Sequence, residues 1–158
     1  MPNITTRTVE ALEDMVSFFQ SRDEMLYVRF TWKKKQRISK LQGSSFRAFV
    51  QEFYYNLHQD IPPKAATEAI VDWFKGKCLA SPRLDPSVRV KKHLEDTWFN
   101  MCDKDWRYLK VNKEGWTLES ECPLEVPLVR ESSVSGCPEP TPGGDLELLK
   151  KHIHYGDE

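Results

Sequence analysis

The sequence predicts an α+β fold made of an N-terminal helix, a basic β-hairpin, a helical hairpin, an antiparallel β-meander and an extended Pro-rich tail. In several stretches of the first half, apolar residues recur every three or four positions, the period of amphipathic helices. Short apolar and aromatic runs separated by turn residues dominate residues 87–120, as in antiparallel strands. With 39% hydrophobic residues, the 158-residue chain can bury a core. We expect one α+β domain over residues 1–121 and a Pro/Gly-rich acidic linker or tail, with a short terminal helix, over residues 122–158.

The first 42 residues are predicted to form a helix and a β-hairpin. Residues 7–20 place Val9, Leu12, Val16 and Phe19 at spacings of three and four, which predicts an amphipathic helix. From residue 24 the sequence EMLYVRFTW is rich in β-branched and aromatic residues, and QRISKL can form the returning arm. The turn lacks the Asn-Gly pair typical of two-residue loops, so the register stays open.

Two antiparallel helices are predicted between residues 44 and 80. Ser44 or Ser45 can cap a helix that continues to residue 58, where apolar residues form a broad stripe. Pro62 and Pro63 interrupt this pattern. Because proline is tolerated in the first turn of a helix, a second helix is expected to start near Lys64.

Residues 87–120 are predicted to form the β-meander, and the helices are expected to pack on its apolar face. Asn112 and Gly115 indicate a tight turn between its last strands. The expected contact joins aromatic residues of the helices to apolar residues of the meander. These are Phe46, Phe49, Phe53, Trp73 and Phe74 on one side, and Val88, Val90, Trp98, Leu109 and Trp116 on the other.

The C-terminal part is predicted to be irregular. Five prolines and three glycines between residues 122 and 144 oppose regular elements, so an extended linker packed along the outside is expected there. Asp145 can cap a short helix over residues 146–154.

The net charge of −1 conceals opposite charges in two parts of the chain. Residues 112–158 carry ten acidic residues against four basic ones, a net charge of −6. Residues 25–51 contain no acidic residue, and their basic side chains can neutralise several phosphates. In the alternative interpretation, the lysines only keep a hairpin tip and an edge strand soluble. The candidate nucleic-acid-binding residues are Arg29, Lys33, Lys34, Lys35, Arg37, Lys40 and Arg47.

Aromatic residues in the same region suggest contacts with a partner. Alternate residues of a strand share a face, so Tyr27 lies beside Arg29, where it could stack on bases, while Phe30 and Trp32 are expected in the core. Core packing is the alternative for Tyr27 as well. Tyr54 and Tyr55 are the candidate residues for binding a protein partner.

The sequence carries no recognised catalytic motif, so we expect no enzyme activity, no catalytic residues, no metal and no cofactor. Gly143-Gly144 is followed by Asp145 and not by the lysine of a phosphate-binding loop. The four cysteines form no C-x-x-C pair. Neither a long apolar run nor a signal sequence is present, which predicts a cytoplasmic protein without membrane contact.

Residues 98–150 resemble a region found in large ATP-binding, primase-helicase-like replication proteins of phages and integrative mobile elements. In those proteins this region precedes the P-loop ATPase domain. The similar motifs are Asp103–Trp106, Gly115-Trp116, Val126–Arg130 and Pro140–Leu149, in that order, and the helical sequence over residues 45–78 is similar too. The chain departs from the family at Asn100–Cys102, where an Asp-Leu pair is common.

The resemblance implies an accessory module that couples a nucleic-acid contact, to DNA in preference to RNA, to a P-loop ATPase domain. In that family the Walker motifs follow downstream of this region. The chain is then either an excised module or a free-standing relative. A free-standing relative would suit a different role, as a phage-encoded adaptor or inhibitor of a host protein, for example one of a defence system.

Overall fold

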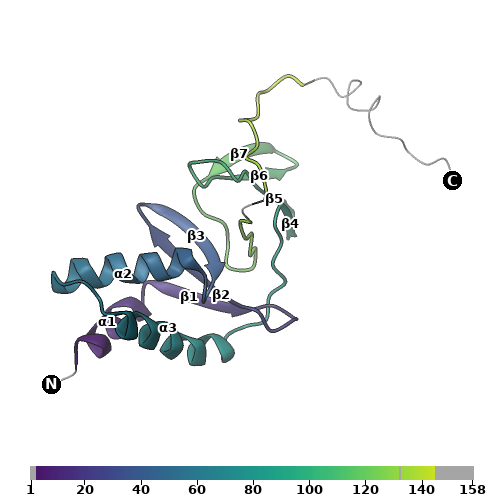
Figure 1. Cartoon of the computed structure of the whole chain (residues 1–158). Coiled ribbons are helices and arrows are strands. Elements are labelled where there is room, and N and C mark those ends of the chain that lie inside the picture. The colour runs from purple at the N-terminus through teal and green to yellow at the C-terminus, as the bar shows by residue number, and fades with distance from the viewer. Residues whose placement is uncertain (1–2, 132, 145–158) are drawn as a thin grey trace.

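The computed structural model describes residues 3–131 and 133–144, which form three helices and two antiparallel sheets (Figure 1). The first sheet has the order β1-β2-β3, and the second is a meander, β4-β5-β6-β7. The predicted α+β class with a β-meander is confirmed. The elements are α1 (Ile4–Glu13), β1 (Val16–Gln20), β2 (Leu26–Trp32), β3 (Lys35–Lys40), α2 (Ser44–His58), α3 (Lys64–Leu79), β4 (Val90–His93), β5 (Asp96–Asn100), β6 (Tyr108–Asn112) and β7 (Gly115–Glu119).

The helices cover one face of the first sheet, where they build the main core. Phe30 of β2 is 1% exposed and packs between Phe46 and Phe49 of α2, with ring centroids 5.4 and 4.7 Å away. Phe74 brings α3 into the same cluster. Burial of each such side chain contributes about 1.5–3 kcal/mol.

The expected packing of the helices on the meander is wrong, because the helices lie on β1–β3. The other face of β1–β3 is also apolar, and it forms a second core with Trp98 and Tyr108 of the meander. This second core, which includes residues of segment 122–129, joins the meander to the first sheet, and the other face of the meander points outward. Val90 and Trp116 on that outer face are 42% and 41% exposed.

The segment 122–129, expected to be linker, lies in this second core. Cys122, Val126 and Leu128 are at most 4% exposed. The Ser87 N–H donates to the Pro127 carbonyl, and the Ser87 carbonyl accepts from the Val129 N–H. Figure 1 shows this segment between the two sheets. The prolines exclude regular strands, but they do not prevent their apolar neighbours from being buried. The terminal helix expected over 146–154 lies outside the described residues.

The first predicted helix is too long. α1 ends at Glu13, and residues 16–20 form β1, which pairs with β2 in the register Val16↔Phe30. Apolar side chains at 16 and 19 fit a helical stripe, yet in β1 they point to opposite faces and serve both cores. At its start, α1 is capped by Asn3, whose Oδ1 accepts from the Thr6 N–H at 2.8 Å.

The hairpin turn between β2 and β3 consists of Lys33 and Lys34. Both have positive φ, 52° and 61°, the conformation that two-residue hairpin loops require. The turn sets the register Trp32↔Lys35 without the usual Asn-Gly pair. The two lysines thus stand at the tip of the basic hairpin.

Candidate nucleic-acid interface

The edge of the basic hairpin meets the β5–β6 loop in a stack of tryptophan and cationic side chains. The Arg37 guanidinium carbon lies 4.5 Å from the ring centroid of Trp32 and 4.6 Å from that of Trp106. Arg130 also lies over Trp106 at 4.6 Å, and the Lys33 Nζ lies over Trp32 at 5.1 Å. We call these five side chains the Trp–Arg stack. Such contacts are worth about 0.5–1 kcal/mol each at exposed sites and more where water is excluded.

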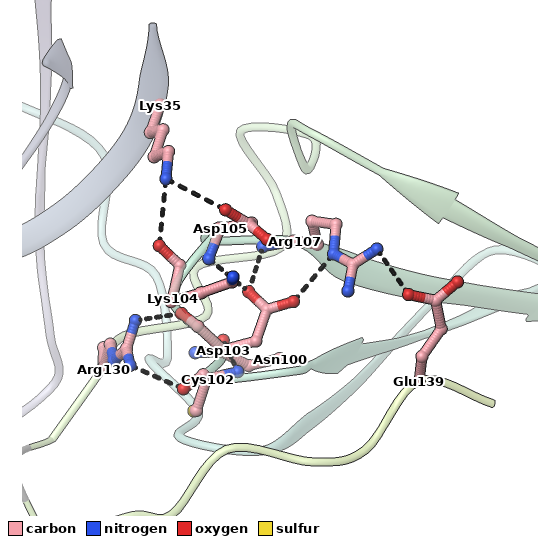
Figure 2. Close-up of polar contacts among 9 residues, drawn as sticks. All are labelled: Lys35, Asn100, Cys102, Asp103, Lys104, Asp105, Arg107, Arg130 and Glu139. Carbon is pink, nitrogen blue, oxygen red and sulfur yellow. Dashed lines mark hydrogen bonds and ion pairs between the residues drawn. The ribbon is translucent and has the colours of Figure 1, made fainter. Parts of the chain in front are cut away.

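Asp103 holds the loop that presents Trp106. Its carboxylate accepts from the backbone N–H groups of Asp105 and Arg107 at 3.0 and 3.1 Å, and from Arg107 Nε at 2.7 Å (Figure 2). Arg107 also donates to Glu139 at 3.0 Å. Although partial burial acts to raise the pKa of Asp103, its hydrogen bonds with Arg107 and Asp105 and the charge of Arg107 hold that pKa below the usual value. The loop is therefore fixed by an ionised carboxylate.

Two further cations tie the loop to its surroundings. Arg130 donates to the carbonyl oxygens of Cys102 and Asp103 at 2.5 and 2.6 Å. Lys35 Nζ donates to the Lys104 carbonyl at 3.0 Å and to the Asp105 carboxylate at 3.3 Å (Figure 2). Lys35 is thus engaged in joining β3 to the loop and is less available for a ligand than the sequence predicts.

Arg37 has aromatic neighbours but no acidic partner. Within residues 3–131 and 133–144, no carboxylate lies within 4.0 Å of its guanidinium, and its buried Nε lacks a hydrogen-bond acceptor. Burial, together with the nearby charge of Arg130, lowers the pKa of Arg37, while the charge of Glu52 acts in the opposite direction. Arginine nevertheless stays protonated in proteins. The two indole rings therefore hold the Arg37 cation in a fixed position with no carboxylate at ion-pair distance, and Glu52, bonded to Trp32, is the acidic group that acts on it from further away.

The other predicted basic residues are placed unequally. Lys33, Lys34 and Lys40 are exposed and Arg47 is half-buried. Lys33 lies 3.8 Å from Glu52, an exposed pair of little strength. The structure brings Lys33, Lys34 and Arg37 together at one end of the hairpin, whereas Lys40 lies at the other end of β3.

The prediction for Arg29 is wrong. Its side chain is buried, with the residue 6% exposed, and its guanidinium donates to the carbonyls of Cys122, Pro123 and Leu124 at 3.2, 2.9 and 3.4 Å. Tyr27, on the same strand face, is 8% exposed and stacks on Phe19 with centroids 5.0 Å apart. This face is covered by segment 122–129, so neither residue can reach a nucleic acid.

The prediction for Tyr54 is wrong as well, while Tyr55 is accessible. Tyr54 is 3% exposed and packs on His58 in the main core, because it lies on the face of α2 that covers the sheet. Tyr55 is 48% exposed. The tyrosine pair thus divides between core and surface.

Sequence reasoning did not identify Trp106 and Arg130 as parts of the site. The Asp103–Trp106 pattern enters only as a motif of the family resemblance, and no local signal tells which strand Trp106 contacts. Only the packing of the second sheet on the first brings Trp106 to Arg37.

Comparisons with protein-family models, with curated proteins and with solved structures find no match. In the described part of the chain, no three His, Cys, Asp or Glu side chains converge as metal ligands would. None of the described helices combines the length and the apolar composition needed to cross a membrane.

Proposed function

We propose that this chain is a non-enzymatic nucleic-acid-binding module whose Trp–Arg stack and hairpin tip contact a single strand. The observation that carries the proposal is Arg37, a cation held by two indole rings without an acidic partner. A guanidinium held in place loses little conformational entropy on binding, and its planar fork matches a phosphate. Lys33 and Lys34 supply further positive charge beside it.

The aromatic residues support a single-stranded ligand. Trp32 and Trp106 are only partly buried residues, and both lie beside the cations of the stack. Proteins that hold single strands combine a basic surface with aromatic side chains that contact bases. Trp32 is fixed by the hydrogen bond from its Nε1 to Glu52 at 2.8 Å.

The resemblance to replication proteins supports a biological setting for this binding. We propose an accessory module of a mobile-element, phage-like replication ATPase, located in the cytoplasm and binding DNA in preference to RNA. Its protein partner would be the P-loop ATPase domain. The nucleic-acid contact and the ATPase partner are separate parts of the proposal, since the first can be tested on this chain alone.

The test is fluorescence anisotropy with labelled single- and double-stranded DNA and RNA of equal length at low salt. We expect single-stranded DNA to bind best, and Lys33→Glu/Lys34→Glu to weaken binding at least tenfold, since each phosphate contact contributes about 1 kcal/mol or more. Lys64→Glu is the matched control, because Lys64 is exposed at the start of α3. No binding of any nucleic acid, or an equal loss in the control, would contradict the proposal.

Binding to a host protein is a second candidate, favoured by the outer face of the meander. Val90, Phe99, Leu109 and Leu118 are paired in register across all four strands, on the face opposite Trp98 and Tyr108. An antiparallel sheet normally presents polar residues to water on such a face. If an apolar protein surface binds here, Leu109→Lys should abolish a nuclease-resistant, stoichiometric complex isolated from bacterial lysate. If Leu109→Lys protein still forms that complex, the outer face of the meander is not the protein-binding site.

A further inference from the structure

Two cysteines far apart in the sequence lie on neighbouring segments beside the Asp103 loop. The N–H of Cys137 donates to the Met101 carbonyl at 2.8 Å, one residue before Cys102. The α-carbons of two residues joined by such a bond lie roughly 5 Å apart, so Cys102, the next residue along the chain after Met101, is a near neighbour of Cys137. At Gly136, an added Cβ would lie 3.1 Å from the Cys102 carbonyl oxygen, which shows how closely the two segments approach.

The Arg89 guanidinium lies beside one of these two thiols, that of Cys137. Its Nη1 donates to the Cys137 Sγ at 3.0 Å and to the Asn100 carbonyl at 3.3 Å, while Nη2 donates to the Ser135 carbonyl at 2.8 Å. Cys137 is exposed, whereas Cys102 is 2% exposed. Cys137 is thus an accessible thiol in hydrogen-bond contact with a guanidinium, the kind of exposed, electropositive setting in which reactive cysteines are found.

We propose that Cys137 and Cys102 form a redox pair, in which hydrogen peroxide oxidises Cys137 and Cys102 resolves the product to a disulfide. In the first step the Cys137 thiolate attacks a peroxide oxygen, an S–O bond forms, the O–O bond breaks, and the leaving hydroxide takes a proton to become water. In the second step Cys102 attacks the Cys137 sulfur, an S–S bond forms, and the sulfenic oxygen leaves as water with the thiol proton. Two thiols lose two electrons in total, and the peroxide gains them.

The environment of Cys102 suits the resolving role. Burial raises its pKa, the charges of Arg89 and Arg130 act in the opposite direction, and a charge on Cys137 raises it further. A buried thiol with a raised pKa reacts slowly with peroxide, so oxidation is expected to begin at Cys137 and not at Cys102. The disulfide would tie the Trp106 loop to the segment around residue 137.

Cys78 and Cys122 provide internal controls. Both are buried thiols hydrogen-bonded to carbonyl oxygens, Cys78 to Phe19 at 3.3 Å and Cys122 to Val126 at 3.2 Å. Burial raises the pKa of both. They should remain reduced under conditions that oxidise Cys137.

The experiment treats the full chain with a small excess of hydrogen peroxide, alkylates free thiols after unfolding, and maps peptides by mass spectrometry. We expect a linked Cys102–Cys137 peptide that has lost two hydrogen atoms, with Cys78 and Cys122 alkylated. Arg89→Met should slow the linkage several-fold. In Cys102→Ala, dimedone should label Cys137 as the accumulated sulfenic acid. The proposal is overturned if Cys137 stays reduced, or if it forms higher oxides or intermolecular disulfides in place of the link to Cys102.

Discussion

Arg37 of β3 lies 4.6 Å from the ring centroid of Trp106, and this contact joins the basic hairpin to the second sheet. The same guanidinium contacts Trp32 at 4.5 Å, so its position is fixed from both sheets. Its charge has no carboxylate partner among the described residues. The proposed contact of the stack with an anion rests on this absence of an ion pair at Arg37.

Replacement of Trp106 by alanine should destabilise the fold. The change removes a half-buried indole and its contacts with Arg37 and Arg130, so we expect a loss of about 2–3 kcal/mol in the free energy of unfolding. Urea unfolding followed by circular dichroism measures it. Trp116→Ala, at a side chain on the outer face, should cost less than about 1 kcal/mol. Similar losses of unfolding free energy in both variants would show that the contacts of Trp106 with Arg37 and Arg130 do not stabilise the fold.

Replacement of Arg29 by methionine should reduce stability but not nucleic-acid affinity. The variant leaves the carbonyls of residues 122–124 without their donor in the second core, at a cost of about 2–4 kcal/mol. Arg22→Met is the control, because that side chain is 84% exposed and should change stability by less than about 0.5 kcal/mol. A loss of affinity by folded Arg29→Met protein, measured by anisotropy, would show that Arg29 contacts the ligand after all.

The stability supplied by Asp103 should depend on pH. Its pKa is lowered in the folded protein, so its contribution is complete above the unfolded pKa of about 3.9 and is lost as the pH falls through the folded pKa. The difference in unfolding free energy between the native chain and Asp103→Asn should therefore narrow below about pH 4. Urea titrations from neutral pH into this acidic range measure the difference. If the difference in unfolding free energy between the two proteins stays constant with pH, the contacts with Arg107 do not lower the pKa of Asp103 in the folded protein.

Two glycines should respond to alanine in opposite directions. At Gly43 a Cβ would lie 2.9 Å from the Lys40 carbonyl oxygen, so Gly43→Ala should destabilise the β3–α2 connection. At Gly76, within α3, no atom lies within 4 Å of an added Cβ, and Gly76→Ala should stabilise by about 0.5–1 kcal/mol. Thermal unfolding of the two variants measures whether the melting temperature falls in Gly43→Ala and rises in Gly76→Ala. A stabilising change at Gly43 would contradict the close contact.

Local patterns predict those elements whose period is unambiguous. α2 and α3 follow from apolar spacing and the Pro62-Pro63 break, and the meander follows from its turn residues. The sequence does not predict the end of α1, because Val16 and Phe19 fit the spacing of a helix as well as that of a strand. Which sheet the helices cover depends on contacts between distant segments, and spacing contains no information about those.

For the candidate site too, local sequence patterns predict some of the residues, whereas others depend on contacts between distant segments. The acid-free stretch draws attention to Lys33, Lys34 and Arg37, which lie together at the hairpin. It also selects Arg29, because charge alone does not reveal that segment 122–129 covers that strand face. Trp106 and Arg130 join the site through the packing of the two sheets, which the sequence does not specify locally.

The most direct test of the central claim is the salt dependence of binding to a labelled single-stranded DNA, measured for the native chain and Arg37→Gln. The account predicts that the native chain binds at low salt. It also predicts that Arg37→Gln reduces the slope of log K against log salt by about 0.7, the value of one phosphate contact on a single strand. The control Lys64→Glu should leave that slope unchanged. An absence of binding, or a slope that Arg37→Gln does not alter, would contradict the account.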